Sequence, residues 1–218
     1  MLDWPGKVAV TVFLSGCDFS CPFCHNPDLA RGGNLTADWS DLTKYLDARS
    51  DWIDGVVVTG GEPTTDPDLM TVLGELRRLG MSVKLDTNGA HPALLMEAVD
   101  RGLVDYVAVD IKTTPERYHL LTRMPDAACR VTETVGLLVA TGIPHEFRTT
   151  AYGPLVKPDE LPRIAKSLSG GHLYAIQQFR PTVTLDPAAA DVVPASPLAL
   201  LAAAEACREW IPTVTRGV

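Results

Sequence analysis

The chain has 218 residues, which is long enough to bury a sizeable core without a disulfide framework. Hydrophobic residues make up 46% and charged residues 21%, values that exclude a disordered chain and a coiled coil. The formal net charge is −8, and no run of Lys or Arg exceeds the pair Arg77–Arg78. We therefore expect no nucleic-acid-binding surface.

Six short segments rich in Val and Ile, each followed by polar or Gly-rich residues, predict buried parallel strands. They are residues 8–14, 55–59, 82–86, 106–111, 146–150 and 173–177. Between them, apolar residues spaced by three and four predict helices, several of which end at a glycine. These are residues 36–48, 66–79, 92–101, 115–121, 128–140, 158–168 and, after a Pro- and Ala-rich connection, 198–210. Thr36 is the expected N-cap of the first helix.

The repeated alternation demands parallel strands with helices outside them. Both an open doubly wound sheet and a partial barrel fit. Almost every strand ends in small or reactive residues, and only a barrel brings all six ends to one mouth. We therefore expect an α/β fold, a partial (β/α)6 TIM-like barrel with parallel strands. No linker separates two domains, so residues 1–218 are expected to form a single domain, with a core at about 3–181 and a C-terminal tail and helix at about 182–218.

The location of the protein is predicted from its apolar stretches. None of them approaches the ~18 residues of a membrane span. Residues 7–17 resemble a lipoprotein signal peptide that ends at a cysteine. However, the acidic Asp3 precedes Lys7, the only basic residue of this segment, and the apolar run has only the minimum length of a signal peptide. We therefore expect a cytoplasmic protein with no membrane partner.

Three of the five cysteines, Cys17, Cys21 and Cys24, form the pattern C-x3-C-x2-C. An odd count at this low density is no disulfide framework. Three thiolates on one loop can hold one metal centre and favour zinc or an iron–sulfur cluster. A [4Fe–4S] cluster held by three cysteines leaves one iron open to a substrate. A closed zinc site needs a fourth ligand, and the adjacent His25 is awkwardly placed to supply it.

Other interpretations of the cysteines stay open. Residues 21–25 match C-x-x-C-H, the c-type haem attachment pattern, but that pattern requires export and leaves Cys17 unexplained. A structural zinc site, or a set of reduced thiols, would make the chain a binding module without catalysis. Cys129 and Cys207 lie on predicted helices and are expected to be small buried hydrophobes.

Several motifs carry a resemblance to a known family. The cysteine spacing, with Phe23 before the last cysteine, and Gly60-Gly61-Glu62-Pro63 after the second strand resemble the signatures of radical S-adenosylmethionine (SAM) enzymes. Residues 3–7, 16–17, 21–27, 86–89 and 110–112 are similar to activating enzymes of glycyl radical enzymes. Residues 174–181 look like the branch that activates anaerobic ribonucleoside-triphosphate reductase. The resemblance covers residues 3 to about 181.

This resemblance implies two cofactors, a [4Fe–4S] cluster on the three cysteines and S-adenosyl-L-methionine, and it requires no general-base triad. Flavodoxin or ferredoxin would supply one electron, and SAM would be cleaved to methionine and a 5′-deoxyadenosyl radical. The radical would abstract hydrogen from a glycine of the partner, most specifically anaerobic ribonucleoside-triphosphate reductase. The alternative is a different radical SAM reaction, on another glycyl radical enzyme, a peptide or a small molecule.

The resemblance also implies the cofactor-binding residues, which are Gly60, Gly61, Glu62, Asp86, Thr87, Asp110, Lys112, Phe23 and Arg148. The glycines would let the backbone approach a ligand, and Glu62 would take the amino group of SAM. The two aspartates and Thr87 would lie close to SAM, with a bridging monovalent cation as one option. Lys112 would approach its carboxylate.

Each of these roles has a structural alternative. The Gly-Gly-Glu-Pro segment is also a tight turn with an acid near a helix N-terminus. Asp110 and Lys112 can pair with each other, and Arg148 can pair internally instead of meeting SAM or substrate. Gln178 and Arg180 are candidates for the ribose or an incoming peptide. His25 and Asn26 are expected to support the cysteine loop through hydrogen bonds.

Overall fold

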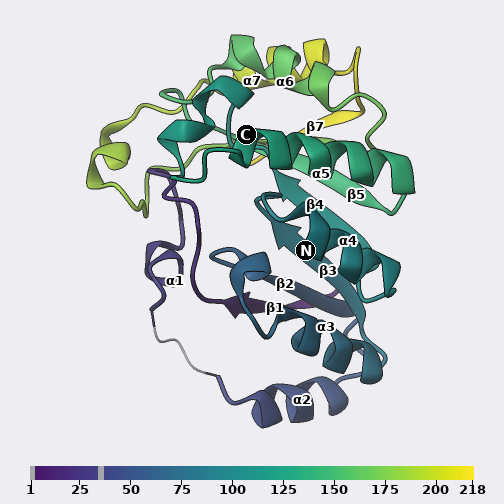
Figure 1. The fold of residues 1–218 in the computed structure, drawn as a ribbon. Coiled ribbons are helices and arrows are strands. Elements are labelled where there is room, and N and C mark those ends of the chain that lie inside the picture. Colours follow the sequence, from purple (N-terminus) through teal and green to yellow (C-terminus); the bar gives the residue numbers. More distant parts are fainter. Residues whose placement is uncertain (1–2, 34–36) are drawn as a thin grey trace.

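The structure is a computed structural model that describes residues 3–33 and 37–218, and it contains one curved sheet with helices packed along it (Figure 1). The strands are β1 Ala9–Leu14, β2 Gly55–Gly60, β3 Ser82–Thr87, β4 Tyr106–Asp110, β5 His145–Ala151, β6 Tyr174–Gln178 and β7 Thr213–Arg216. The α-helices are α1 Pro27–Ala30, α2 Trp39–Asp47, α3 Leu69–Arg78, α4 Pro92–Asp100, α5 Ala127–Thr141, α6 Leu161–Ser167 and α7 Pro197–Cys207. Short 3₁₀ helices span Pro63–Thr65, Pro115–Leu120, Pro158–Glu160 and Pro187–Asp191.

All seven strands are parallel and lie in chain order from β1 to β7. A doubly wound sheet would reverse its strand order at a switch point, and this sheet does not. The consecutive order is that of a barrel, with helices crossing from each strand to the next. Strands β1 and β7 are the two edges, so the barrel is open. The carboxyl ends of the strands therefore surround one mouth.

The core lies between the sheet and its helices. In β2, Val56 and Val58 pack into this core, while Val57 faces the inside of the barrel. Both faces of the strand are covered, as expected for a parallel sheet of β-branched residues. In α3, leucines at positions 69, 73 and 76 recur at the helical period and are buried. The burial of these side chains holds α3 against the outside of the sheet.

The six predicted strands form to within one residue of the expected ends. The expected six βα units are present, and part of the C-terminal tail adds a further strand, β7, beside β6, which was not expected. Residues 115–121 were expected to form an α-helix and instead contain the 3₁₀ helix Pro115–Leu120, which starts at a proline. Thr36 lies outside the described residues. The N-cap of α2 is Asp38, whose carboxylate accepts the Ser40 N–H at 2.7 Å.

The remaining sequence expectations concern the two isolated cysteines and the membrane. Cys207 is buried in α7, as predicted. Cys129 is exposed, so its expected burial is wrong: it lies on the solvent face of α5, beside the apolar stripe that includes Val131 and Val135. Among residues 3–33 and 37–218, no helix is long and apolar enough to cross a membrane.

Candidate functional site

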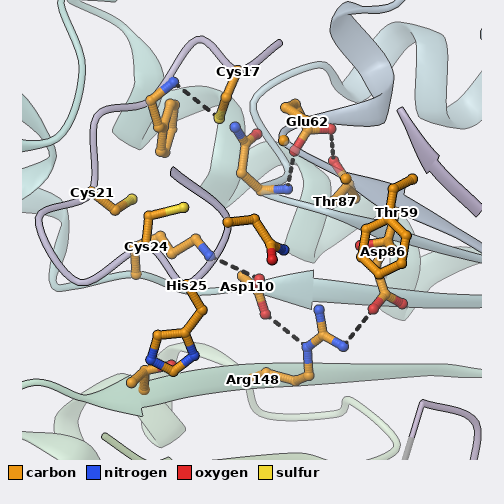
Figure 2. A pocket seen from close by; sticks show the side chains of 18 of the residues that line it. Cys17, Cys21, Cys24, His25, Thr59, Glu62, Asp86, Thr87, Asp110 and Arg148 are labelled. Carbon is orange, nitrogen blue, oxygen red and sulfur yellow. Dashed lines mark hydrogen bonds and ion pairs between the residues drawn. The ribbon is translucent and has the colours of Figure 1, made fainter. Parts of the chain in front are cut away.

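A cavity of about 390 Å³ opens at the carboxyl ends of the strands (Figure 2). It is lined by residues from the loop after β1 and from the ends of β2, β3, β4 and β5. Every metal-binding and cofactor-binding residue predicted from the sequence lines it, namely Cys17, Cys21, Cys24, Phe23, Gly60, Gly61, Glu62, Asp86, Thr87, Asp110, Lys112 and Arg148. The fold thus brings together motifs that are far apart along the chain.

The end of β2 is bound to the start of the cysteine loop. The Gly61 N–H donates to the Leu14 carbonyl at 2.9 Å, and the Glu62 N–H donates to the Gly16 carbonyl at 2.7 Å. A Cβ atom on Gly60, whose φ is +142°, would lie 1.9 Å from the Leu14 oxygen, and one on Gly61 would lie 2.1 Å from the Gly16 oxygen. The two glycines are therefore required by close backbone packing between β2 and this loop.

Asp18, inside the cysteine motif, is the main polar anchor of the loop. Its carboxylate accepts a hydrogen bond from the Asn88 side chain at 2.8 Å and lies 2.9 Å from His91 Nε2. Its carbonyl accepts the Thr122 hydroxyl at 2.8 Å. Burial raises the pKa of Asp18, but His91 and Asn88 outweigh this effect and lower it, while Asp18 raises the pKa of His91. The loop is thus held by an ion pair to the start of α4.

The three cysteines of the motif are free thiols facing the cavity. The Cys17 sulfur accepts the Phe19 N–H at 3.4 Å. Burial raises the pKa of Cys17 to about 12 and that of Cys21 to about 11. Within the described part of the chain, no three His, Cys, Asp or Glu side chains converge on a position for a single metal ion.

A cluster of aromatic side chains supports the other end of the loop. The ring centroid of Phe23 lies 5.1 Å from that of Tyr152, which lies 5.0 Å from that of Phe179. His25 stacks on Phe179 at 6.5 Å, and its Nε2 lies 3.1 Å from the Arg180 carbonyl. Tyr152 and Phe179 were missed by the sequence analysis, although both directly follow strands at the mouth. They link the loop to β5 and β6.

The carboxylate of Glu62 is surrounded by hydrogen-bond donors of the protein. It is 1% exposed and accepts the Thr64 N–H at 3.1 Å, the Thr64 hydroxyl at 2.6 Å, the Thr87 hydroxyl at 2.6 Å and the Asn88 N–H at 2.5 Å. Burial raises the pKa of Glu62, and these donors oppose that shift. Glu62 thus caps the 3₁₀ helix Pro63–Thr65, which is the structural alternative weighed for this motif, and it also joins the ends of β2 and β3.

Arg148 on β5 bridges two carboxylates inside the mouth. Its Nη1 lies 2.7 Å from Asp86 Oδ2, and its Nε lies 2.7 Å from Asp110 Oδ1 (Figure 2). Lys112 Nζ lies 2.8 Å from Asp110. Burial alone would raise the pKa of Asp110, but Arg148 and Lys112 hold it well below its usual range. Arg148 therefore pairs internally with both carboxylates.

Some residues that line the cavity belong to no recognised sequence motif. Alternation along the strands points one side chain in two into the barrel, so Gln177 lines the cavity whereas its neighbour Gln178 does not. Gln178 instead donates to the Ala195 carbonyl at 3.2 Å, and Arg180 is also absent from the cavity lining. Strand alternation could have identified the other missed members, which include Thr11, Phe13, Thr59 and Thr150.

Comparison with known proteins gives a consistent family. The sequence model described as "Radical SAM superfamily" matches residues 11–168. A protein of Methanocaldococcus jannaschii named "Putative glycyl-radical enzyme activating enzyme" is 31% identical over 85% of this chain and 78% of its own length. The pyruvate formate-lyase-activating enzyme of Clostridium pasteurianum is 33% identical over 51% of this chain and 48% of its own length.

Solved structures share the fold. Streptococcus suis SuiB bound to S-adenosylmethionine superposes with a TM-score of 0.71 at 15% identity, over 97% of this chain and 51% of that chain. This chain therefore spans about half the length of that structure and of the Clostridium relative. The radical SAM superfamily uses a [4Fe–4S] cluster and SAM. Since the family model covers most of the sequence, the chain belongs to the radical SAM superfamily.

Proposed function

We propose that the chain is an activating enzyme for a glycyl radical enzyme, most specifically anaerobic ribonucleoside-triphosphate reductase. The observation that carries the proposal is the meeting of the cysteine motif and the strand-end residues in one cavity. When bound, the reduced [4Fe–4S] cluster supplies the electron that cleaves SAM to methionine and a 5′-deoxyadenosyl radical, which takes hydrogen from a glycine of the partner. The cofactors supply the difficult chemistry, and the protein orients them.

The donor set fits an iron–sulfur cluster. Cys17, Cys21 and Cys24 are free and line the same cavity, and thiolates are the ligands that iron–sulfur clusters require. In a cluster each cysteine binds a different iron, so the sulfurs need not converge on one point as they would around zinc. Because burial raises the pKa of Cys17 and Cys21, their thiolates would form together with metal binding.

The remaining lining residues suit the amino-acid end of SAM. Lys112 donates one of its three ammonium N–H groups to Asp110, and its other N–H groups can donate to a ligand carboxylate. Backbone groups of residues 60–62 would meet the amino group, while the Glu62 side chain holds that segment against Thr87. Arg148 holds the Asp86 and Asp110 carboxylates in place at the cavity wall. We assign no general acid or base, because the radical itself takes the hydrogen.

The partner is the finer part of the proposal. Residues 174–181 support anaerobic ribonucleoside-triphosphate reductase, whereas curated relatives include pyruvate formate-lyase-activating enzymes. Pyruvate formate-lyase is therefore the second candidate partner. We further propose that residues 1–218 form one radical SAM domain, because the tail adds β7 to the same sheet. Electron donation by flavodoxin or ferredoxin and a cytoplasmic location stay predictions.

The test is anaerobic reconstitution followed by activation assays. The protein should bind about four iron and four sulfide per chain. With reductant and SAM it should form 5′-deoxyadenosine, and it should produce a glycyl radical, detected by EPR, on the anaerobic reductase and not on pyruvate formate-lyase. A glycyl radical on pyruvate formate-lyase alone would show that pyruvate formate-lyase, and not the anaerobic reductase, is the partner. Absence of 5′-deoxyadenosine from a fully loaded protein would contradict the proposal.

A further inference from the structure

Arg216 on β7 reaches across the inside of the barrel to Glu146 on β5. Its Nη2 lies 2.6 Å from Glu146 Oε2, and its Nη1 lies 3.1 Å from Oε1. The Glu146 side chain is 0% exposed, so its charge depends entirely on such partners. Strand β7 was not predicted, and it lies outside the residues matched by the family model.

Glu146 and Asp86 share two other cations. Lys84 Nζ lies 2.9 Å from Asp86 Oδ1 and 3.7 Å from Glu146 Oε1. Arg148 Nη1 lies 2.7 Å from Asp86 Oδ2 and 3.9 Å from Glu146 Oε1. Burial alone would raise the pKa of Glu146, but Arg216, Arg148 and Lys84 lower it. Of these three cations, Arg216 is the nearest, and it is the one with no contact to Asp86.

We propose that Arg216 is a positioning residue that neutralises Glu146 and thereby leaves Arg148 free to bridge Asp86 and Asp110 at the cofactor cavity. Breaking a buried ion pair on one side leaves the other charge uncompensated, at a high cost in a medium of low dielectric constant. Without Arg216, the Glu146 carboxylate would draw Lys84 and Arg148 toward itself. The carboxylates at the cavity wall would then lose their fixed positions.

Two readouts test the inference. The second, SAM binding, rests on the proposed function, whereas the first needs no cofactor and is independent of that function. In the metal-free full-length chain, the Arg148 Nε–H donates to Asp110 at 2.7 Å. Its ¹⁵N–¹H resonance, identified by its loss in Arg148→Lys, should exchange slowly with solvent. In Arg216→Gln the exchange should be about tenfold faster or the signal should disappear. In the double variant Arg216→Gln with Glu146→Gln, slow exchange should return, because position 146 then has no carboxylate that competes with Asp86 and Asp110 for Arg148.

The second readout is the dissociation constant for SAM in the reconstituted protein. Arg216→Gln should weaken SAM binding by about tenfold, a size in the range seen for coupled neighbours. The double variant should bind SAM within about threefold of Glu146→Gln alone. Arg163→Gln is the matched control, because Arg163 is also an arginine paired with a glutamate distant in the sequence, Glu116, but on the surface. It should change neither readout.

Three results would overturn the proposal. The first is an Arg216→Gln protein with a lowered melting temperature but unchanged Arg148 exchange and SAM affinity, since that is a purely structural role. The second is a folded double variant that recovers neither readout. The third applies if the single variant Arg216→Gln does not fold. The proposal then requires that Arg216→Gln, added to Glu146→Gln, changes neither the Arg148 exchange rate nor the SAM affinity. A loss in either readout would contradict the proposal. A wild-type protein that does not bind SAM would refute the proposed function, while the exchange test would still decide this inference.

Discussion

Glu62 holds a full set of hydrogen-bond donors inside the protein, although its motif is read as a ligand-binding one. Its Oε2 accepts the Asn88 N–H, so an amide nitrogen in that place would set two donors against each other. We expect Glu62→Gln to lower the free energy of unfolding by about 1–3 kcal/mol, as measured by urea denaturation. An unchanged value would show that the carboxylate is not needed between β2 and β3.

The control for this change is Glu75→Gln on the surface of α3. Glu75 pairs with Arg78, three residues further along the solvent-facing side of α3, and such surface pairs contribute little to stability. The free energy of unfolding should therefore change by no more than about 0.5 kcal/mol in this variant. A loss of equal size in both variants would mean that the Glu62 effect is not specific to its buried hydrogen bonds.

The five cysteines separate into two groups with different expected effects. Replacing Cys17, Cys21 or Cys24 with alanine should abolish reductive SAM cleavage, because each removes a proposed cluster ligand. Cys129→Ala and Cys207→Ala should leave cleavage intact, since neither side chain lines the cavity. The measurement is 5′-deoxyadenosine formed per iron-loaded chain. Turnover that survives in any of the first three variants would contradict the ligand assignment.

At the scale of elements, the cysteine loop is held by groups from outside its own sequence. Asp18 joins it to Asn88 after β3, to His91 before α4 and to Thr122. We expect Asp18→Ala to weaken iron binding by about tenfold or more while keeping all three thiols, because such supporting groups orient metal ligands. The iron content after desalting against a chelator measures this. Asp28→Ala, on the exposed side of α1, should match the wild type.

For the molecule as a whole, we expect acid stability to depend on His145, a buried histidine at the start of β5. His145 and His172 stack at 4.3 Å, and His145 Nε2 lies 3.3 Å from the His172 backbone nitrogen. Burial is the main cause that lowers the pKa of His145 in the folded state. Near pH 6.5 the unfolded chain binds a proton on this side chain more readily than the folded chain does, so stability is lost as the pH falls through this value.

This loss can be measured by denaturant unfolding at two pH values. Between pH 7.5 and 5.5, His145 should account for a decrease of up to about 1.4 kcal/mol in the free energy of unfolding. A His145→Gln variant should show a correspondingly smaller dependence over the same interval. A variant with the same pH dependence as the wild type would exclude His145 as the titrating group.

The sequence predicted the strands and the membership of the site well, for a physical reason. Buried runs of Val and Ile identify β1 to β6, and a barrel necessarily gathers their carboxyl ends. Strand β7 was missed because Thr213–Arg216 is a short edge strand without an apolar run. The partners of Glu62 and Arg148 could not be predicted. They depend on contacts between side chains of different strands across the inside of the barrel, and no local sequence pattern predicts such contacts.

The consecutive strand order has a consequence for synthesis on the ribosome. Each strand pairs with the one made just before it, so β1 to β6 can assemble before β7 is translated. Until Arg216 emerges, the counter-ions beside Glu146 among residues 3–33 and 37–218 are Lys84 and Arg148. A prematurely released polypeptide would thus display all three cysteines and every recognised motif, yet its mouth would lack the charge arrangement of the finished protein.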